Sequence, residues 1–192
     1  MKSLPRIFMV LASIILVLVF FFPIWSITLI APQYPSGITM YIWINQITGE
    51  SPGTLQNINI LNHYVGMQFI VPDSIPELKY FQFVVGTLIL LGLAAVFFNK
   101  KGYYLAWVIL IIILGILAVY DFYLWEYDYG HNLSPTAPIK VPGAAYQPPL
   151  IGKKIILNFT AYSWPHIGGI FVGASVLFGL AAFWLKHKIT KR

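Results

Sequence analysis

The sequence predicts an all-α integral membrane protein: four transmembrane helices, both termini in the cytoplasm, and two ordered extracytoplasmic segments with short strand and helix structure. Two observations predict this class. The 192 residues are 58% hydrophobic and only 9% charged, whereas a soluble domain carries about 25% charged residues. In addition, basic residues gather beside long apolar runs, and the acidic residues lie elsewhere.

Four apolar runs are long enough to cross a bilayer, which takes about 20 residues. They cover residues 7–29, 80–98, 103–125 and 168–185. The first run has a basic start, but it exceeds the roughly 7–15 apolar residues of a signal peptide and lacks a small-residue cleavage site. It therefore predicts an uncleaved anchor.

The basic clusters predict the orientation of these helices. Eight of the twelve Lys and Arg residues lie in three clusters: Lys2 and Arg6; Lys100 and Lys101; and Lys186, Lys188, Lys191 and Arg192. Lys and Arg mark cytoplasmic flanks, so this topology leaves segments 30–79 and 126–167 outside and the acidic residues at or beyond the outer face. The net charge of +6 then reflects topology. A nucleic-acid footprint would instead gather its charge on one folded face.

The outer segments carry patterns of their own. Residues 38–44 are rich in β-branched and aromatic residues and predict a strand. Helical spacing of apolar residues predicts a helix from about 55 to 67, capped by Ser51 or Thr54. Residues 155–159 predict a second strand, which would pair with the first.

The fourth helix is predicted to start at Trp164-Pro165, because proline is tolerated in the first turn of a helix. Its small residues include the Gly169-x-x-x-Gly173 pattern, which is typical of close helix packing in membranes. Packing within the chain is the favoured interpretation, and docking to a helix of a partner is the alternative.

The histidines and methionines suggest a metal site. There are no cysteines, which excludes thiolate ligands and thiol catalysis. A helix would place His63 and Met67 on one face, and imidazole with thioether suits copper, especially Cu(I). Met40, His131 or His166 would complete the ligand set. The alternative is that His63 bonds an asparagine and Met67 fills a gap in a core.

Asp121 is the acidic residue of greatest interest, because it lies inside the third apolar run. An ionisable residue at that depth is a functional-site hypothesis by default. With His166, it would take up protons at the outer interface in a quinol-oxidising subunit. If the helix simply surfaces there, Asp121 is an ordinary hydrated residue.

Aromatic residues of the outer segments are the candidates for partner contact. Six are expected to anchor such a contact: Tyr34, Trp43, Tyr64, Trp125, Tyr129 and Tyr146. The chain has no phosphate-binding glycine loop and no nucleophile elbow. We therefore expect no catalytic residues, and an accessory subunit instead of an enzyme.

Four motifs carry a resemblance to a known family. They are APQYPSG (31–37), NINILNHYVGM (57–67), EYDYGHNL (126–133) and YQPPLIG (146–152). In these stretches the chain resembles the NosB-like family, small four-helix membrane proteins encoded beside the copper enzyme nitrous oxide reductase in clade II clusters. The resemblance implies the bacterial cytoplasmic membrane, a periplasmic functional face and nitrous oxide reductase as partner. It supplies no catalytic residues.

Three functions are therefore expected from the sequence. The first is a non-catalytic membrane subunit that docks a periplasmic copper redox enzyme through its outer segments and binds no cofactor of its own. The second is a copper-handling protein that uses His63, Met67, His131 or His166. The third is a quinol-oxidising subunit that uses Asp121 and His166.

Overall fold

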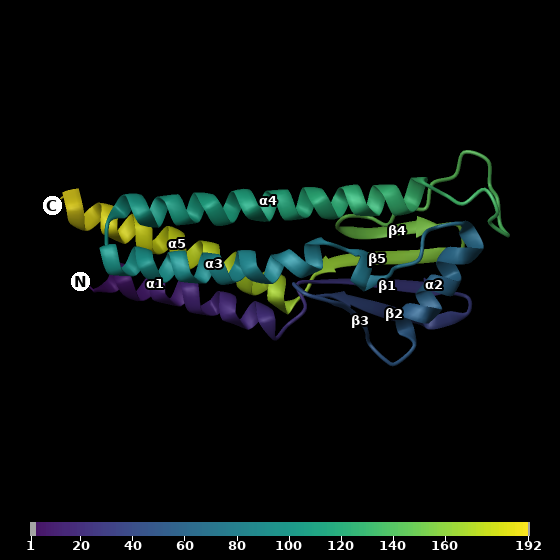
Figure 1. The fold of residues 1–192 in the computed structure, drawn as a ribbon, viewed down its shortest axis with the longest axis horizontal. Coiled ribbons are helices and arrows are strands. Elements are labelled where there is room, and N and C mark those ends of the chain that lie inside the picture. The colour runs from purple at the N-terminus through teal and green to yellow at the C-terminus, as the bar shows by residue number, and fades with distance from the viewer. Residues whose placement is uncertain (1–2, 192) are drawn as a thin grey trace.

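The computed structural model describes residues 3–191, which form a helical bundle and, at one end of it, a sheet domain (Figure 1). The elements in chain order are α1 (Leu4–Ile15), η1 (Leu16–Phe20), β1 (Trp25–Ala31), β2 (Tyr34–Ile42), β3 (Ile47–Gly49), α2 (Thr54–Val65), η2 (Pro72–Ser74), α3 (Glu77–Phe98), α4 (Lys101–His131), β4 (Gly152–Ile156), β5 (Phe159–Pro165) and α5 (Ile167–Lys191).

Three helices, α3, α4 and α5, are long and apolar enough to cross a membrane, and α1 with η1 forms a shorter apolar segment, Leu4–Phe20. Large apolar side chains cover the outside of the bundle, and the Phe97 side chain is 82% exposed. An apolar surface of this extent is typical of contact with lipid and not with water. The bundle thus indicates residence in a membrane.

The prediction of a helix over the whole first apolar run is wrong. The helical part ends at Phe20, and Trp25–Ala31 forms β1. Pro23 cannot donate the hydrogen bond that a continuing helix needs, and the segment that follows contains the β-branched residues Ile27, Thr28 and Ile30, which favour a strand. Because β1 pairs on both sides, with β2 and with β5, the sheet satisfies its backbone groups.

A five-stranded antiparallel sheet therefore accompanies the helices, in the order β3-β2-β1-β5-β4. The all-α class was incomplete. The predicted pairing of residues 155–159 with residues 38–44 is also wrong, because β4 pairs with β5 and β1 lies between β2 and β5. The β4–β5 and β1–β2 hairpins close short loops, which costs less entropy than a distant pairing.

The junction between bundle and sheet domain runs through the start of α5. Pro165 ends β5, so the predicted helix start at Trp164-Pro165 is wrong by two residues. The Gly168 amide donates to the Pro23 carbonyl at 2.8 Å. A Cβ on Gly168 would lie 2.6 Å from the carbonyl oxygen of Phe22, so only glycine allows this close approach.

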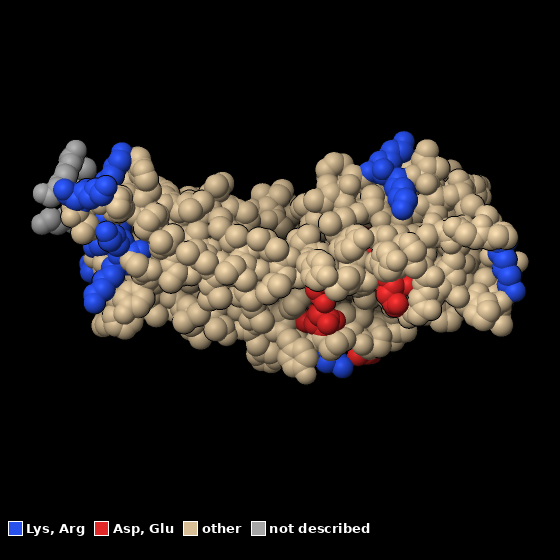
Figure 2. Space-filling model, turned by 90° about the horizontal axis from the view of Figure 1, so that it is seen from above, with Lys and Arg blue, Asp and Glu red and all other residues tan. Residues whose placement is uncertain are grey.

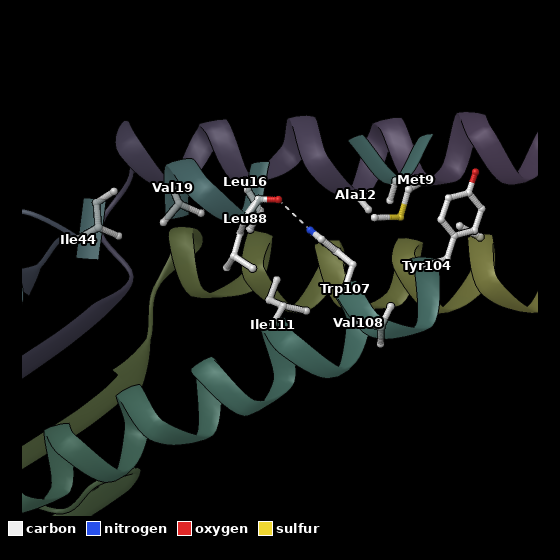
Figure 3. Close-up of a cluster of buried hydrophobic side chains, with 12 residues drawn as sticks. Met9, Ala12, Leu16, Val19, Ile44, Leu88, Tyr104, Trp107, Val108 and Ile111 are labelled. Carbon is white, nitrogen blue, oxygen red and sulfur yellow. Dashed lines mark hydrogen bonds between the residues drawn. The ribbon is translucent and has the colours of Figure 1, made fainter. Parts of the chain in front are cut away.

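The bundle core packs through aromatic and small residues. The Trp107 indole donates to the Leu88 carbonyl at 2.8 Å (Figure 3). The Ser175 hydroxyl donates to the Ala12 carbonyl at 2.6 Å, which joins α5 to α1. A Cβ on Gly179 would meet Val108 at 2.8 Å, whereas a Cβ on Gly173 would meet no described atom within 4 Å. At Ser175 and Gly179, the small residues of α5 thus pack within the chain.

The acidic residues lie on one half of the molecule along its long axis, whereas basic residues occur on both halves. Figure 2 shows one group of Lys and Arg at the end of the bundle that holds both termini, and it shows the visible Asp and Glu residues, together with further Lys or Arg residues, on the half that carries the sheet domain. This arrangement agrees with the clustering in the sequence.

Candidate functional site

Helix α4 extends beyond the bundle and supplies part of the sheet-domain core. It is 31 residues long and ends beside the sheet domain (Figure 1). Past the apolar run 103–125, the ring of Tyr129 packs 4.2 Å from that of Trp125, and its hydroxyl donates to the Phe69 carbonyl at 3.1 Å. The final turns of the helix are thereby fixed to the sheet domain.

Glu126 lies on this final part of α4 and is 0% exposed. Among residues 3–191, neither of its carboxylate oxygens has a hydrogen-bond partner. Burial raises the pKa of Glu126 to about 8, and the positive charge of Lys154 opposes this rise only in part. Desolvation disfavours the ionised form, so without a bound cation the side chain is mostly a neutral acid at pH 7.

Glu126 and Tyr146 face the same cavity, which has a volume of about 60 Å³. Tyr146 is 3% exposed, and its hydroxyl also lacks a hydrogen-bond partner within the described chain. The remaining lining is mostly apolar and comes from the sheet, α2, α4 and the strand-linking loops: Ile27, Leu29, Met40, Ile58, Leu61, Asn62, Val65, Met67, Ile70, Trp125, Tyr129, Pro148, Ile156 and Phe159. Unsatisfied polar groups at one apolar cavity are a recurrent feature of binding sites.

Residues 146–150, which contribute Tyr146 and Pro148 to the lining of this cavity, are called the strap. The Tyr146 amide donates to the Gly130 carbonyl at 2.8 Å, the Lys154 ammonium donates to the Gln147 carbonyl at 2.9 Å, and the Ser163 hydroxyl donates to the Leu150 carbonyl at 3.0 Å. Gly130 lets the strap backbone lie against α4, because any Cβ there would overlap Gln147. Three hydrogen bonds and one close backbone contact thus hold the strap.

A second cavity, of about 130 Å³, lies where the bundle meets the sheet domain. Its polar lining consists of Asp121 on α4 and Glu77 at the start of α3. His166 does not line it; its ring packs on Tyr41 at 5.2 Å. The apolar lining comes from Ile24, Trp25, Ile42, Ile47, Ile75, Leu78, Phe81, Ala118, Val119, Phe122 and Trp125. Asp121 thus faces a cavity, but one it does not share with His166.

An exposed apolar patch covers α2 and the turn after it. We call it the α2 patch; it consists of Ile60, His63, Tyr64 and Phe69. The side chains of Ile60, Tyr64 and Phe69 are 52%, 49% and 54% exposed. The His63 ring stacks on Phe69 at 6.0 Å and packs beside Tyr64.

The structure does not bring the four predicted metal ligands together. Helix α2 ends at Val65 and Gly66 adopts a left-handed φ of 83°, so Met67 lies beyond the helix and does not share a helix face with His63, although both residues line one surface hollow. His131, at the end of α4, stacks on Tyr127, and His166 lies at the junction. Within residues 3–191 there is no cluster of three or more His, Asp or Glu side chains suited to a metal ion.

Of the six aromatic residues predicted to contact a partner, Tyr64 alone is exposed. Tyr34, Trp43 and Trp125 are partly buried, and the Trp43 indole donates to Thr48 at 2.9 Å. Tyr129 and Tyr146 are buried, so the structure contradicts their role as surface anchors. Aromatic content alone does not separate core from surface.

Sequence reasoning missed Glu126 as a site residue, although a signal was present. Phe122, Trp125, Glu126 and Tyr129 follow the i, i+3, i+4, i+7 spacing of a buried helix face. An acidic residue on such a face is exceptional. The charge pattern predicts only that Glu126, like the other acidic residues, lies at or beyond the outer face.

The fold and the cavities define a class: a membrane-embedded helical bundle that carries a five-stranded sheet domain with a buried carboxylate. Comparison with protein-family models, with curated proteins and with solved structures finds no match to the chain.

Proposed function

We propose that the chain is a non-catalytic membrane subunit that docks a periplasmic copper redox enzyme of the nitrous oxide reductase kind. In this proposal α1 with η1, α3, α4 and α5 cross the bacterial cytoplasmic membrane, both termini are cytoplasmic, and the sheet domain faces the periplasm. The α2 patch is the contact surface, because it presents exposed aromatic and aliphatic side chains together.

The observation that supports the proposal most directly is that hydrogen bonds hold the α2 patch in a fixed conformation. The Asn59 side chain accepts from the Ile70 amide at 2.7 Å and donates to the Ile70 carbonyl at 3.1 Å, which fixes the turn after α2. The Ile139 amide donates to the Tyr64 carbonyl at 2.9 Å. A pre-ordered surface loses little conformational entropy on binding, and the motif resemblance supplies the partner class.

Photocrosslinking in native membranes tests this proposal. A photoreactive amino acid replaces Tyr64 or Phe69, and the control replaces Leu177, which is 68% exposed on α5 and expected to face lipid. We expect protein adducts with the copper enzyme from positions 64 and 69, and lipid adducts from position 177. If the enzyme is present and positions 64 and 69 yield no adduct with it, the α2 patch is not its docking surface.

The second cavity favours one alternative, a subunit that binds a quinol headgroup at the outer membrane interface. Its volume of about 130 Å³ approaches that of an engineered cavity of about 150 Å³ that admits benzene. Asp121 and Glu77 line it and would accept hydrogen bonds from quinol hydroxyls. The redox cofactor would belong to a partner.

Binding of a quinol analogue to the purified protein tests this alternative. Asp121→Asn should weaken binding, whereas Asp73→Asn, a change of an exposed acid, should leave it unchanged. Equal binding by both variants would remove Asp121 from a quinol site.

A further inference from the structure

The cavity between the sheet and the end of α4 holds a set of polar and soft atoms that the docking function does not use. Both Glu126 oxygens and the Tyr146 hydroxyl are buried and lack hydrogen-bond partners within residues 3–191. Met40 and Met67 line the same cavity. The chain has only four methionines, so two of them lie at the site of the unpaired carboxylate.

Charge balance favours a monovalent cation as the occupant. An isolated ionised carboxylate in an apolar interior is very costly, and a single opposite charge beside it reduces that cost. A divalent ion would leave one net positive charge buried, near the ammonium of Lys154. One Glu126 carboxylate and one monovalent ion leave the cavity neutral.

The donor atoms favour a soft ion over a hard one. Hard cations take six or more oxygen ligands, and this cavity offers mainly Glu126 and Tyr146. The Asn62 amide at its edge already donates to the Gln68 carbonyl at 3.3 Å. Thioethers bind Cu(I) and similar soft ions well, and a cavity of about 60 Å³ has room for one ion.

We infer that the cavity beneath the strap binds one soft monovalent metal ion, Cu(I) or Ag(I), through Glu126 and the thioethers of Met40 and Met67, with the Tyr146 hydroxyl as a further oxygen donor. This site shares Met67 and the candidate ligand Met40 with the metal site predicted from the sequence, but it uses Glu126 and Tyr146 in place of His63, His131 and His166. It does not depend on the docking proposal, because all of its ligands lie inside the chain.

Titration of the full-length protein in detergent with silver nitrate, in chloride-free buffer, tests the site by calorimetry. Ag(I) is a soft, closed-shell monovalent ion that needs no reductant. We expect one ion per chain for the site. Glu126→Gln and the double change Met40→Leu with Met67→Leu should each weaken binding by more than the roughly 10–100-fold typical of losing an outer-shell partner.

Two controls separate this site from other silver ligands. Met9→Leu changes a methionine that is 0% exposed in the bundle, and His63→Ala removes an exposed imidazole; both should keep the affinity of the cavity site. Met→Leu conserves volume and is usually tolerated, and a thermal melt of each variant checks folding.

Three results would overturn the inference. The first is no silver binding by the wild-type protein, which would indicate that a proton alone neutralises Glu126. The second is a silver affinity that is unchanged in both Glu126→Gln and the double methionine variant. The third is thermal stabilisation by potassium nitrate equal to that by silver nitrate, which would indicate a hard-cation site.

Discussion

At the residue scale, Glu126 and Gly130 lie one helical turn apart on α4, where Glu126 lines the first cavity and Gly130 contacts the strap. Glu126 brings a carboxylate into the apolar interior, and Gly130 leaves the space in which Gln147 packs. The strap backbone can lie against α4 at this point only because the glycine has no side chain. Each position therefore yields a separate test.

Gly130→Ala should destabilise the sheet domain. The added methyl group would overlap the backbone of Gln147, so the strap must move and its contacts with α4 weaken. We expect a loss of about 1–3 kcal/mol, as for overpacked cores, measured by reversible unfolding in detergent. Gly115→Ala on the same helix meets no described atom within 4 Å and is the control; an equal loss in both variants would contradict the close contact at Gly130.

The stability of metal-free protein should fall as pH rises from about 5 to about 8. Folding raises the pKa of Glu126 from its usual value to about 8, so in this window the folded state holds a proton that the unfolded state has released. The free energy of unfolding then falls by up to about 1.4 kcal/mol per pH unit. Unfolding in chelator-treated samples measures this slope.

Glu126→Gln should flatten that slope, because the amide does not titrate. Asp73→Asn, at an exposed acid, should leave the slope of the wild-type protein in place. A slope that persists in Glu126→Gln would assign the pH dependence to another group.

At the scale of elements, the contacts of α5 separate two uses of its small residues. Gly179 lies against Trp107 and Val108, whereas nothing described lies within 4 Å of a Cβ at Gly173. The Gly169-x-x-x-Gly173 spacing suggested a single packing motif, yet its two glycines have different surroundings. A Cβ on Gly169 would lie 2.7 Å from the Ile24 carbonyl oxygen, at the junction with the sheet domain.

Gly179→Leu should lower the unfolding temperature of the detergent-solubilised protein, because the side chain forces α5 away from α4. The expected loss is about 1–3 kcal/mol. Gly173→Leu should leave the stability of the isolated chain near that of the wild-type protein. If Gly173→Leu is the more damaging change, the assignment of the α4–α5 contact to Gly179 is wrong.

At the scale of the whole molecule, the proposal assigns the bundle to anchoring in the membrane and the sheet domain to presenting the α2 patch to a partner. Helix α4 belongs to both, and α1 and α5 connect through short junctions to β1 and β5. This continuity fixes the α2 patch and both cavities relative to the bundle. In the proposed topology, the basic end of Figure 2 faces the cytoplasm.

Single cysteine variants test this topology cleanly, because the chain has no cysteine. Ser36→Cys and Asn158→Cys, at exposed positions of the sheet domain, should react with a membrane-impermeant maleimide in spheroplasts. Lys101→Cys and Lys191→Cys, at the basic end, should react only after the membrane is permeabilised. Labelling of position 101 before permeabilisation would contradict the orientation.

Much of the membrane architecture was predictable from composition. Long apolar runs and flanking charges act locally, so the helices of 80–98, 103–125 and 168–185 were found close to α3, α4 and α5. The helix of α2 was also predicted, within two residues at each end, because Gly66 and the apolar spacing are local signals.

What the sequence by itself determined was the membrane class and the separation of charge, since hydropathy and charge need no partner segment. The tertiary structure alone decided the strand order of the sheet and the two cavities. Trp25 bonds Ser163 across 138 positions of sequence at 2.7 Å, and no local pattern specifies a pairing that distant. Glu126 likewise is a site residue only in the folded chain, where its carboxylate is buried without a hydrogen-bond partner among the described residues.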